Sequence, residues 1–158
     1  MKSIDNIAVI IQARLSSQRI PKKMIKDFAG SNLTDIAIKK IKNSKIIPLE
    51  NFFLSAYEKE LKEVAIKNNV KIFHRSKKSA YSEGTPLTEM YEWWDKLDNK
   101  FSHVILVSAC APFLKIETID KFVKEFASKK EDGMLTVIKK NNYFWDKYVV
   151  SYINGRIL

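Results

Sequence analysis

Several residue types are scarce in this 158-residue sequence, and each scarcity excludes a class of protein. A single cysteine, Cys110, excludes a disulfide framework and a zinc site built from several cysteines. Four glycines and four prolines are too few for a collagen-like or low-complexity chain. No apolar run approaches the roughly 20 residues that cross a bilayer. The N-terminus does not read as a signal peptide, because the acidic Asp5 precedes the first apolar run. We therefore expect a cytoplasmic protein without a membrane segment.

Acidic residues are also outnumbered, and this imbalance points to an anionic partner. The chain has 28 Lys and Arg against 18 Asp and Glu, a net charge of +10. Such a charge favours either a nucleic acid or a small phosphorylated molecule, and a lysine-rich surface without a specific partner is the alternative. Aromatic residues lie among lysines at 139–147. No nucleic-acid-binding motif accompanies them, so we predict no nucleic-acid partner.

Short β-branched runs alternate with longer amphipathic segments along the chain. Residues 7–11 are a near-continuous apolar run, typical of a strand that is covered on both faces. Further strands are predicted at 52–56, 70–73, 104–107, 134–138 and 149–153, and helices at 33–41, 58–68, 85–97 and 116–126. This alternation predicts an α/β fold, a three-layer sandwich with a mostly parallel sheet, in one domain over residues 1–158. Asn154-Gly155 predicts a hairpin turn.

The loop after the first strand carries a dense set of cationic and hydroxyl groups. Between Gln12 and Lys23 lie two arginines, two serines and two lysines, and no carboxylate occurs before Asp27. Ligands of open α/β sheets bind beyond the carboxyl ends of the strands, and these groups suit a chain of phosphates. The glycines of a Walker loop or a dinucleotide fingerprint are absent. A solvated basic loop is the alternative interpretation.

The order of residues in this loop resembles a family signature. The pattern Ala13-Arg14-Leu15-x-Ser17-x-Arg19-Ile20-Pro21-x-Lys23 resembles that of the sugar-activating cytidylyltransferases, which include the acylneuraminate (CMP-sialic acid), ketodeoxyoctonate and pseudaminic or legionaminic acid enzymes. Weaker likenesses follow at Lys26–Gly30, Phe73–Ser76 and Leu106–Leu114. The resemblance implies a Rossmann-like fold of the nucleotide-diphospho-sugar transferase type. It also implies transfer of CMP from CTP to a 2-keto acidic sugar for cell-surface polysaccharides, with release of pyrophosphate.

The resemblance also implies a role for each matching residue. Arg14 and Lys23 would hold the triphosphate and neutralise the charge that develops on the leaving pyrophosphate. The other nucleotide-binding residues that it implies are Ala13, Leu15, Ser17, Arg19, Arg75, Ser108 and Ala109. Glu83 and Pro112 would lie on the sugar side.

The family uses Mg²⁺, but the sequence identifies no metal ligand. Cys110 stands where the ketodeoxyoctonate branch has an aspartate. The sialic acid branch lacks that aspartate as well. The late aspartates Asp132 and Asp146 do not fit the family pattern. No base neighbours Cys110, so we expect a buried thiol at a strand end rather than a nucleophile.

Two other functions are left open. One is a truncated, non-catalytic homologue that binds nucleotide or acts as an assembly partner, because the family normally continues beyond the matched part. The other is a sugar nucleotidyltransferase of the spore-coat type, which shares the Gln12-Ala13-Arg14 opening. The matched part lacks the family's dimerisation arm, so a homodimer is left open as well.

Overall fold

A parallel four-stranded sheet forms the centre of the computed structural model, which describes residues 2–81, 86–137, 152–153 and 156–157. The strands lie in the order β3-β2-β1-β4, so the first strand of the chain is central. Their bounds are Ile7–Gln12 (β1), Phe52–Ala56 (β2), Lys71–His74 (β3) and His103–Leu106 (β4). β1 pairs with β2 and β4, and β2 pairs with β3, all in parallel. The predicted mostly parallel sheet is confirmed.

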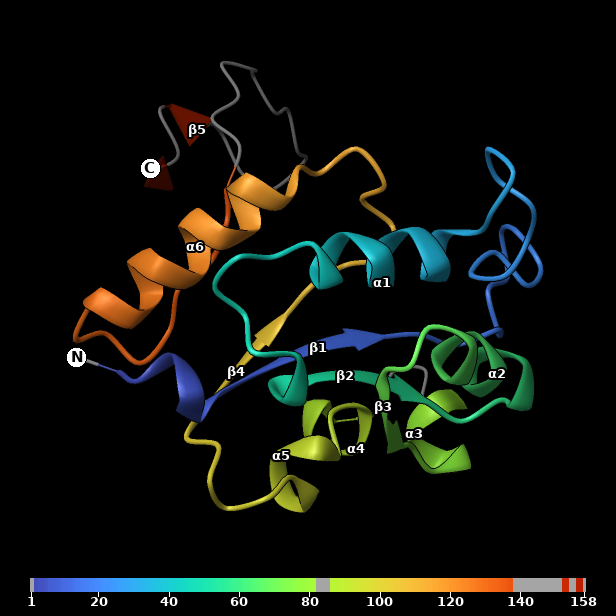
Figure 1. Ribbon diagram of the computed structural model, residues 1–158, viewed down its shortest axis with the longest axis horizontal. Helices are drawn as coiled ribbons and strands as arrows, with labels where there is room; N and C mark the ends of the chain where they lie inside the picture. The colour runs from blue at the N-terminus through green and yellow to red at the C-terminus, as the bar shows by residue number, and fades with distance from the viewer. Residues whose placement is uncertain (1, 82–85, 138–151, 154–155, 158) are drawn as a thin grey trace.

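Helices cover both faces of this sheet. Figure 1 shows α1 and α6 on one side, and α3, α4 and α5 on the other. The helices are α1 (Leu33–Lys42), α2 (Lys59–Lys67), α3 (Lys77–Tyr81), α4 (Leu87–Met90), α5 (Trp93–Lys96) and α6 (Ile116–Ser128), with single 3₁₀ turns η1 (Ile4–Asn6) and η2 (Leu49–Asn51). None of the helices in the described ranges is long and apolar enough to span a membrane.

The apolar run of β1 is explained by burial on its two faces. Ile7, Val9 and Ile11 point into the larger core, which also contains side chains of α1, α2 and α6. Ala8 and Ile10 point the other way, against Trp93 of α5. Because successive strand residues face opposite sides, a strand that is covered twice has no polar face.

Most predicted elements are found within a residue or two, but the helix predicted at 85–97 is wrong. Pro86 is the N-cap of α4, and Tyr91 leaves the helical conformation with φ −111° and ψ 52°. The Met90 carbonyl accepts hydrogen bonds from the side chains of Ser79 (2.9 Å) and Gln12 (3.3 Å). The Met90 carbonyl therefore joins α4 to β1 and α3. A second short helix, α5, follows the break.

Two predicted strands near the end differ from the structure or are only partly described. Residues 134–137 form no strand, and Leu135 and Val137 are almost fully exposed, so neither has the packing that a sheet would give. Residue 138 lies outside the described part. Of the strand predicted at 149–153, β5 (Tyr152–Ile153) is described, and it pairs with β6 (Arg156–Ile157) in antiparallel register. Ile153 faces Arg156 across the predicted turn, whose residues 154–155 lie outside the described ranges.

A buried carboxylate, that of Asp35, joins α1 to the end of α2. Asp35 is 6% exposed and accepts hydrogen bonds from Ser31 Oγ (2.5 Å) and Asn68 Nδ2 (2.8 Å), and its ion pair with Lys39 spans 2.7 Å. Burial by itself raises the pKa of this carboxyl, but the bonds from Lys39, Ser31 and Asn68 outweigh it and lower the pKa to about 2. The charged form of Asp35 therefore stabilises the fold.

We expect Asp35→Asn to lower the free energy of unfolding by about 2 kcal/mol at pH 7. The folded-state pKa lies below the unfolded one, so this contribution is complete above about pH 4 and is lost as the pH falls toward 2. Urea unfolding of both proteins at pH 7, 5 and 3 measures it. The exposed Asp27→Asn is the control. A difference that stays constant down to pH 3 would contradict the assignment.

Candidate functional site

The carboxyl ends of the four strands bring the predicted nucleotide-binding segments to one edge of the sheet. Each segment continues the strand ladder for one residue: Ala13 N donates to Ser55 O (3.0 Å), Arg75 N to Ala56 O (3.1 Å) and Val107 N to Ile10 O (2.9 Å). The chain then leaves the sheet at each of these points. The loops that carry Arg14, Arg75 and Ser108 therefore start side by side, as the sequence predicts for an open α/β sheet.

The loop after β1 is held by the first turn of α2. Leu15 N donates to Glu58 Oε1 (2.9 Å), and Lys22 Nζ lies 3.1 Å from Glu60 Oε1. Lys22 adopts φ +51°, and Ile25 N and Lys26 N both donate to its carbonyl oxygen, which makes a tight turn. Lys23 has no side-chain hydrogen bond or ion pair to any residue that the structure describes. Of the two neighbouring lysines, Lys22 is thus engaged with the protein.

The Arg14 side chain reaches from this loop toward α3. Its Nη1 donates to Ala80 O at 3.5 Å, and the residue is half-buried. Burial lowers the pKa of the Arg75 guanidinium to about 10, and the positive charge of Arg14 contributes to that shift. The two arginines are therefore close enough to repel each other. Two guanidiniums at the carboxyl edge of the sheet, one after central β1 and one after edge strand β3, suit an anion with several negative charges.

Arg75 itself is bound into the protein more firmly than the sequence suggests. It is 4% exposed, its Nε donates to Ser79 Oγ (2.7 Å), and its Nη2 donates to Ser79 O (2.6 Å) and Met90 O (3.3 Å). These bonds tie the end of β3 to α3 and α4. Contact of Arg75 with a nucleotide stays a prediction. The hydrogen bonds of Arg75 in the structure are those of a group that organises the walls of the site.

The segment after β4 carries three of the predicted residues. Ser108 is exposed, Ala109 is buried, and Pro112 is half-buried. Lys40 of α1 donates from Nζ to Ala111 O and Pro112 O, both at 2.9 Å, and burial lowers the pKa of its ammonium group. This clamp from α1 holds the backbone of the segment in place.

The expectation that Cys110 is buried is wrong, because its thiol is exposed. β4 ends at Leu106, and the chain then turns, with Cys110 N donating to Ser108 Oγ (3.2 Å) and Ala111 N to Ser108 O (3.3 Å). Residues 109 and 110 thus belong to a turn and not to the strand end, so the alternation of a buried strand does not extend to Cys110.

Ser17 and Arg19 lie in the same loop as Arg14, Ser17 half-buried and Arg19 exposed. Ser17 N donates to Leu15 O (2.9 Å), which places a tight turn directly after Leu15. Glu83, predicted on the sugar side, and residues 139–147 lie outside the described ranges. Asp132 is exposed, far along the chain from the loop after β1, and Asp146 lies outside the described ranges.

A protein-built magnesium site is not found in the described part of the chain. No three His, Cys, Asp or Glu side chains there are grouped so that they could hold a metal ion. Mg²⁺ prefers carboxylate oxygens together with phosphate oxygens of a substrate. The described residues therefore do not fit a dedicated metal site.

Several residues of this site were missed by sequence reasoning. Glu58 lies two residues after the end of the strand predicted at 52–56, and that position at the sheet edge is a signal that could have found it. Gln12 accepts a hydrogen bond from Trp93 Nε1 (2.8 Å) and thereby joins the end of β1 to α5. No local pattern marks Lys40, because its partners lie 71 and 72 residues along the chain.

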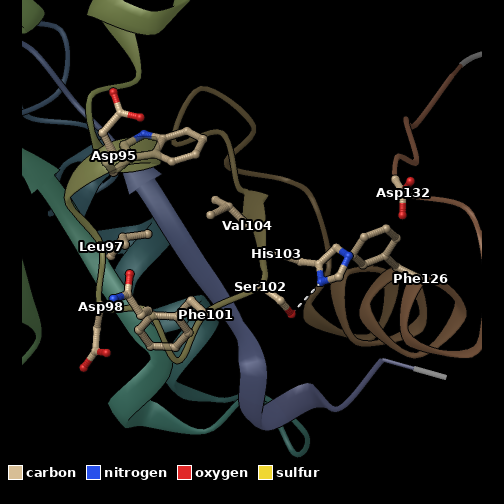
Figure 2. Close-up of a pocket in the computed structure, with 11 residues that line it drawn as sticks. Asp95, Leu97, Asp98, Phe101, Ser102, His103, Val104, Phe126 and Asp132 are labelled. Atoms are coloured by element: carbon tan, nitrogen blue, oxygen red, sulfur yellow. Dashed lines mark hydrogen bonds between the residues drawn. The ribbon is translucent and has the colours of Figure 1, made fainter.

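A cavity of about 400 Å³ lies elsewhere, at the amino end of β4. Figure 2 shows Leu97 and Phe101 on one side and His103 and Phe126 on the other, with Ser102 Oγ 2.8 Å from His103 Nδ1. It is separated from the loop after β1 by the length of the strands. The predicted nucleotide-binding residues do not line it.

The parallel sheet and the basic loop after its first strand define an α/β fold of the nucleotidyltransferase type. A solved cytidylyltransferase from Leptospira borgpetersenii has the same fold, with a TM-score of 0.63 at 22% identity over 79% of this chain and 50% of that chain. A family model described as cytidylyltransferase matches residues 8–148, and the chain belongs to this family. The resemblance read from the loop motif is thereby confirmed.

Two curated relatives carry more specific names. A pseudaminic acid cytidylyltransferase from Campylobacter jejuni is 32% identical over 121 residues, which are 74% of this chain and 51% of that protein. A 3-deoxy-manno-octulosonate cytidylyltransferase from Rickettsia bellii is 26% identical over 136 residues, 85% of this chain and 53% of that protein. The chain thus spans about half the length of the curated relatives it matches.

Proposed function

We propose that the protein transfers CMP from CTP to a 2-keto acidic sugar of the sialic, pseudaminic or legionaminic acid type and releases pyrophosphate. One observation carries the proposal: Arg14 lies at the end of the central strand, beside Arg75 and on the loop that carries Lys23, in a chain that belongs to the cytidylyltransferase family. The names of the relatives support an acidic sugar as the acceptor.

The residues of the loop support the transfer by binding and orientation. The anomeric hydroxyl of the sugar attacks the α-phosphorus, a new O–P bond forms, the bond to the bridging oxygen of pyrophosphate breaks, and the hydroxyl proton passes to solvent. Negative charge grows on the departing pyrophosphate. The forked guanidinium of Arg14 and the mobile ammonium of Lys23 are suited to offset that charge. Holding the two substrates in line supplies much of the remaining rate enhancement.

Magnesium would be brought to the site by the nucleotide. When bound to the phosphates of CTP, Mg²⁺ would supply further charge neutralisation. The groups that this chain contributes to the phosphates are those of Arg14, Lys23 and the loop backbone.

A second candidate function is nucleotide binding without transfer. It rests on the basic loop after β1, whose Arg14 and Lys23 suit the phosphates of a nucleotide whether or not a sugar acceptor follows. In that case the loop after β1 would bind CTP, and no transfer to a sugar would follow.

Titration calorimetry with CTP, UTP, ATP and GTP, each with and without Mg²⁺, tests both candidates. We expect CTP to bind at least about tenfold more tightly than the other three, a difference of about 1.4 kcal/mol. Pyrophosphate release is then measured with a panel of 2-keto acidic sugars. Release with one of them supports transfer, and selective CTP binding without release supports the second candidate. If none of the four nucleotides binds, both candidates are wrong.

A further inference from the structure

Glu58 occupies the N-cap of α2, but its side chain does not cap that helix. The residue lies two positions after the end of β2, and its backbone carbonyl accepts the Lys62 N–H (3.2 Å) as the helix begins. Its carboxylate makes no hydrogen bond to the first turn of α2. Instead Oε1 accepts the N–H of Leu15, 43 residues earlier in the chain, at 2.9 Å. The carboxylate thus binds the loop after β1, whereas the side chain of an N-cap residue commonly accepts a hydrogen bond from its own helix.

The N–H of Leu15 belongs to the peptide unit that links Arg14 to Leu15. That unit is planar, so holding its N–H in one direction also sets the direction of the Arg14 carbonyl and limits the path of the Arg14 backbone. A tight turn follows directly, in which Leu15 O accepts the Ser17 N–H at 2.9 Å. The hydrogen bond from Leu15 N–H to Glu58 therefore fixes the backbone between Arg14, which precedes it, and the turn at Ser17, which follows it.

The charge of Glu58 needs a second explanation, because a neutral amide oxygen would accept the same bond. Glu58 is 8% exposed, and its other oxygen, Oε2, is buried. A buried carboxylate oxygen of this kind is costly unless nearby charges compensate for it. Arg75 supplies such a charge: burial and the charge of Arg14 lower the pKa of Arg75, and the negative charge of Glu58 opposes that shift. The Tyr81 hydroxyl also interacts with Glu58, and burial together with this interaction raises the pKa of Tyr81.

We propose that Glu58 is a positioning residue of the nucleotide site, which holds the Leu15 amide so that Arg14 faces the phosphates and offsets the repulsion between Arg14 and Arg75. The contact itself stands on the structure alone. Its effect on CTP binding rests on the function proposed above. In this arrangement the loop is ordered before the nucleotide arrives, so binding does not have to supply the cost of ordering it.

Variants at position 58 separate the hydrogen bond from the charge. Glu58→Gln keeps an acceptor oxygen at the same distance from the backbone and removes the charge. Glu58→Ala removes both, and Glu58→Asp keeps the charge on a side chain one methylene shorter. Glu63→Ala is the matched control, because Glu63 lies on the same helix, is exposed, and pairs only at 3.8 Å with Lys59 among the described residues.

Hydrogen exchange of the Leu15 amide, followed by NMR, tests the contact without any ligand. We expect at least about tenfold faster exchange in Glu58→Ala and Glu58→Asp, and exchange within about threefold of the unmodified protein in Glu58→Gln and Glu63→Ala. The aspartate variant keeps the test decisive if the alanine variant does not fold. Unchanged Leu15 exchange in a folded Glu58→Ala or Glu58→Asp protein would overturn the proposal.

CTP titration of the same variants tests the consequence. We expect Glu58→Ala to weaken CTP binding at least about tenfold. For Glu58→Gln we expect a change within about threefold, because two effects of removing the negative charge oppose each other. The phosphates are repelled less, but the repulsion between Arg14 and Arg75 is offset less. Equal losses in Glu58→Ala and Glu63→Ala would overturn the positioning role. If the unmodified protein binds no CTP, the proposed function fails, and the exchange experiment still decides the contact.

Discussion

Arg14→Ala is expected to weaken the binding of CTP at least about 30-fold, which corresponds to about 2 kcal/mol. Hydrogen bonds from a charged donor to phosphate are worth roughly that much, and Arg14 is the guanidinium that the loop after β1 places beside Arg75. Arg14→Lys recovers only part of the loss, since an ammonium group cannot make two parallel bonds to one phosphate. Calorimetry with CTP measures all three proteins. Where turnover is detected, kcat/KM falls in the same order.

Lys77→Ala is the matched control for this result. Lys77 is an exposed cation at the start of α3, with no side-chain hydrogen bond or ion pair to the residues that the structure describes. We expect its loss to change CTP affinity less than twofold. Similar losses in Arg14→Ala and Lys77→Ala would mean that the overall positive charge, and not a site at the end of β1, attracts the nucleotide.

Arg75→Ala is expected to lower the free energy of unfolding by about 3 kcal/mol. The substitution removes the donors that reach Ser79 Oγ, Ser79 O and Met90 O, three hydrogen bonds of a buried guanidinium. It also leaves the carboxylate of Glu58 with one fewer positive neighbour. Urea unfolding at pH 7 measures the loss. CTP affinity falls as well, because α3 carries the carbonyl that accepts from Arg14.

Two further variants show whether this loss comes from the buried network. Arg75→Lys keeps a positive charge but reaches fewer acceptors, so we expect about half of the destabilisation. Arg19→Ala removes an exposed guanidinium, and its free energy of unfolding stays within about 0.5 kcal/mol of the unmodified protein. A similar stability for Arg75→Ala and Arg19→Ala would show that Arg75 does not organise the walls of the site.

The sheet and its main helices could be predicted because their signals are local. A central strand that is buried on both faces must be apolar at every position, as residues 7–11 are, and the strand at 52–56 was predicted with its observed bounds. The helices at 33–41 and 116–126 show the spacing of one buried face, and the structure extends them by one and two residues. The loop motif was equally readable, since its meaning lies in the order of neighbouring residues.

Contacts between distant residues could not be predicted in this way. The helix predicted at 85–97 is interrupted because the Met90 carbonyl takes donors from Gln12, Arg75 and Ser79. No local pattern reports that those donors converge there. Cys110 is exposed for a related reason, because the turn after β4 is shaped by Ser108 and by the clamp from Lys40.

By itself, the sequence determined the class of fold, the position of the basic loop at the end of the first strand, and the likeness to the cytidylyltransferases. Each depends on residues that are adjacent or regularly spaced, so the amino-acid order already contains it. Only the tertiary structure decided that Glu58 holds the loop and that Arg75 is bound by Ser79 and Met90. Those roles arise because parallel strands bring their carboxyl ends together, and a hydrogen bond across that edge depends on distance in space and not on separation along the chain.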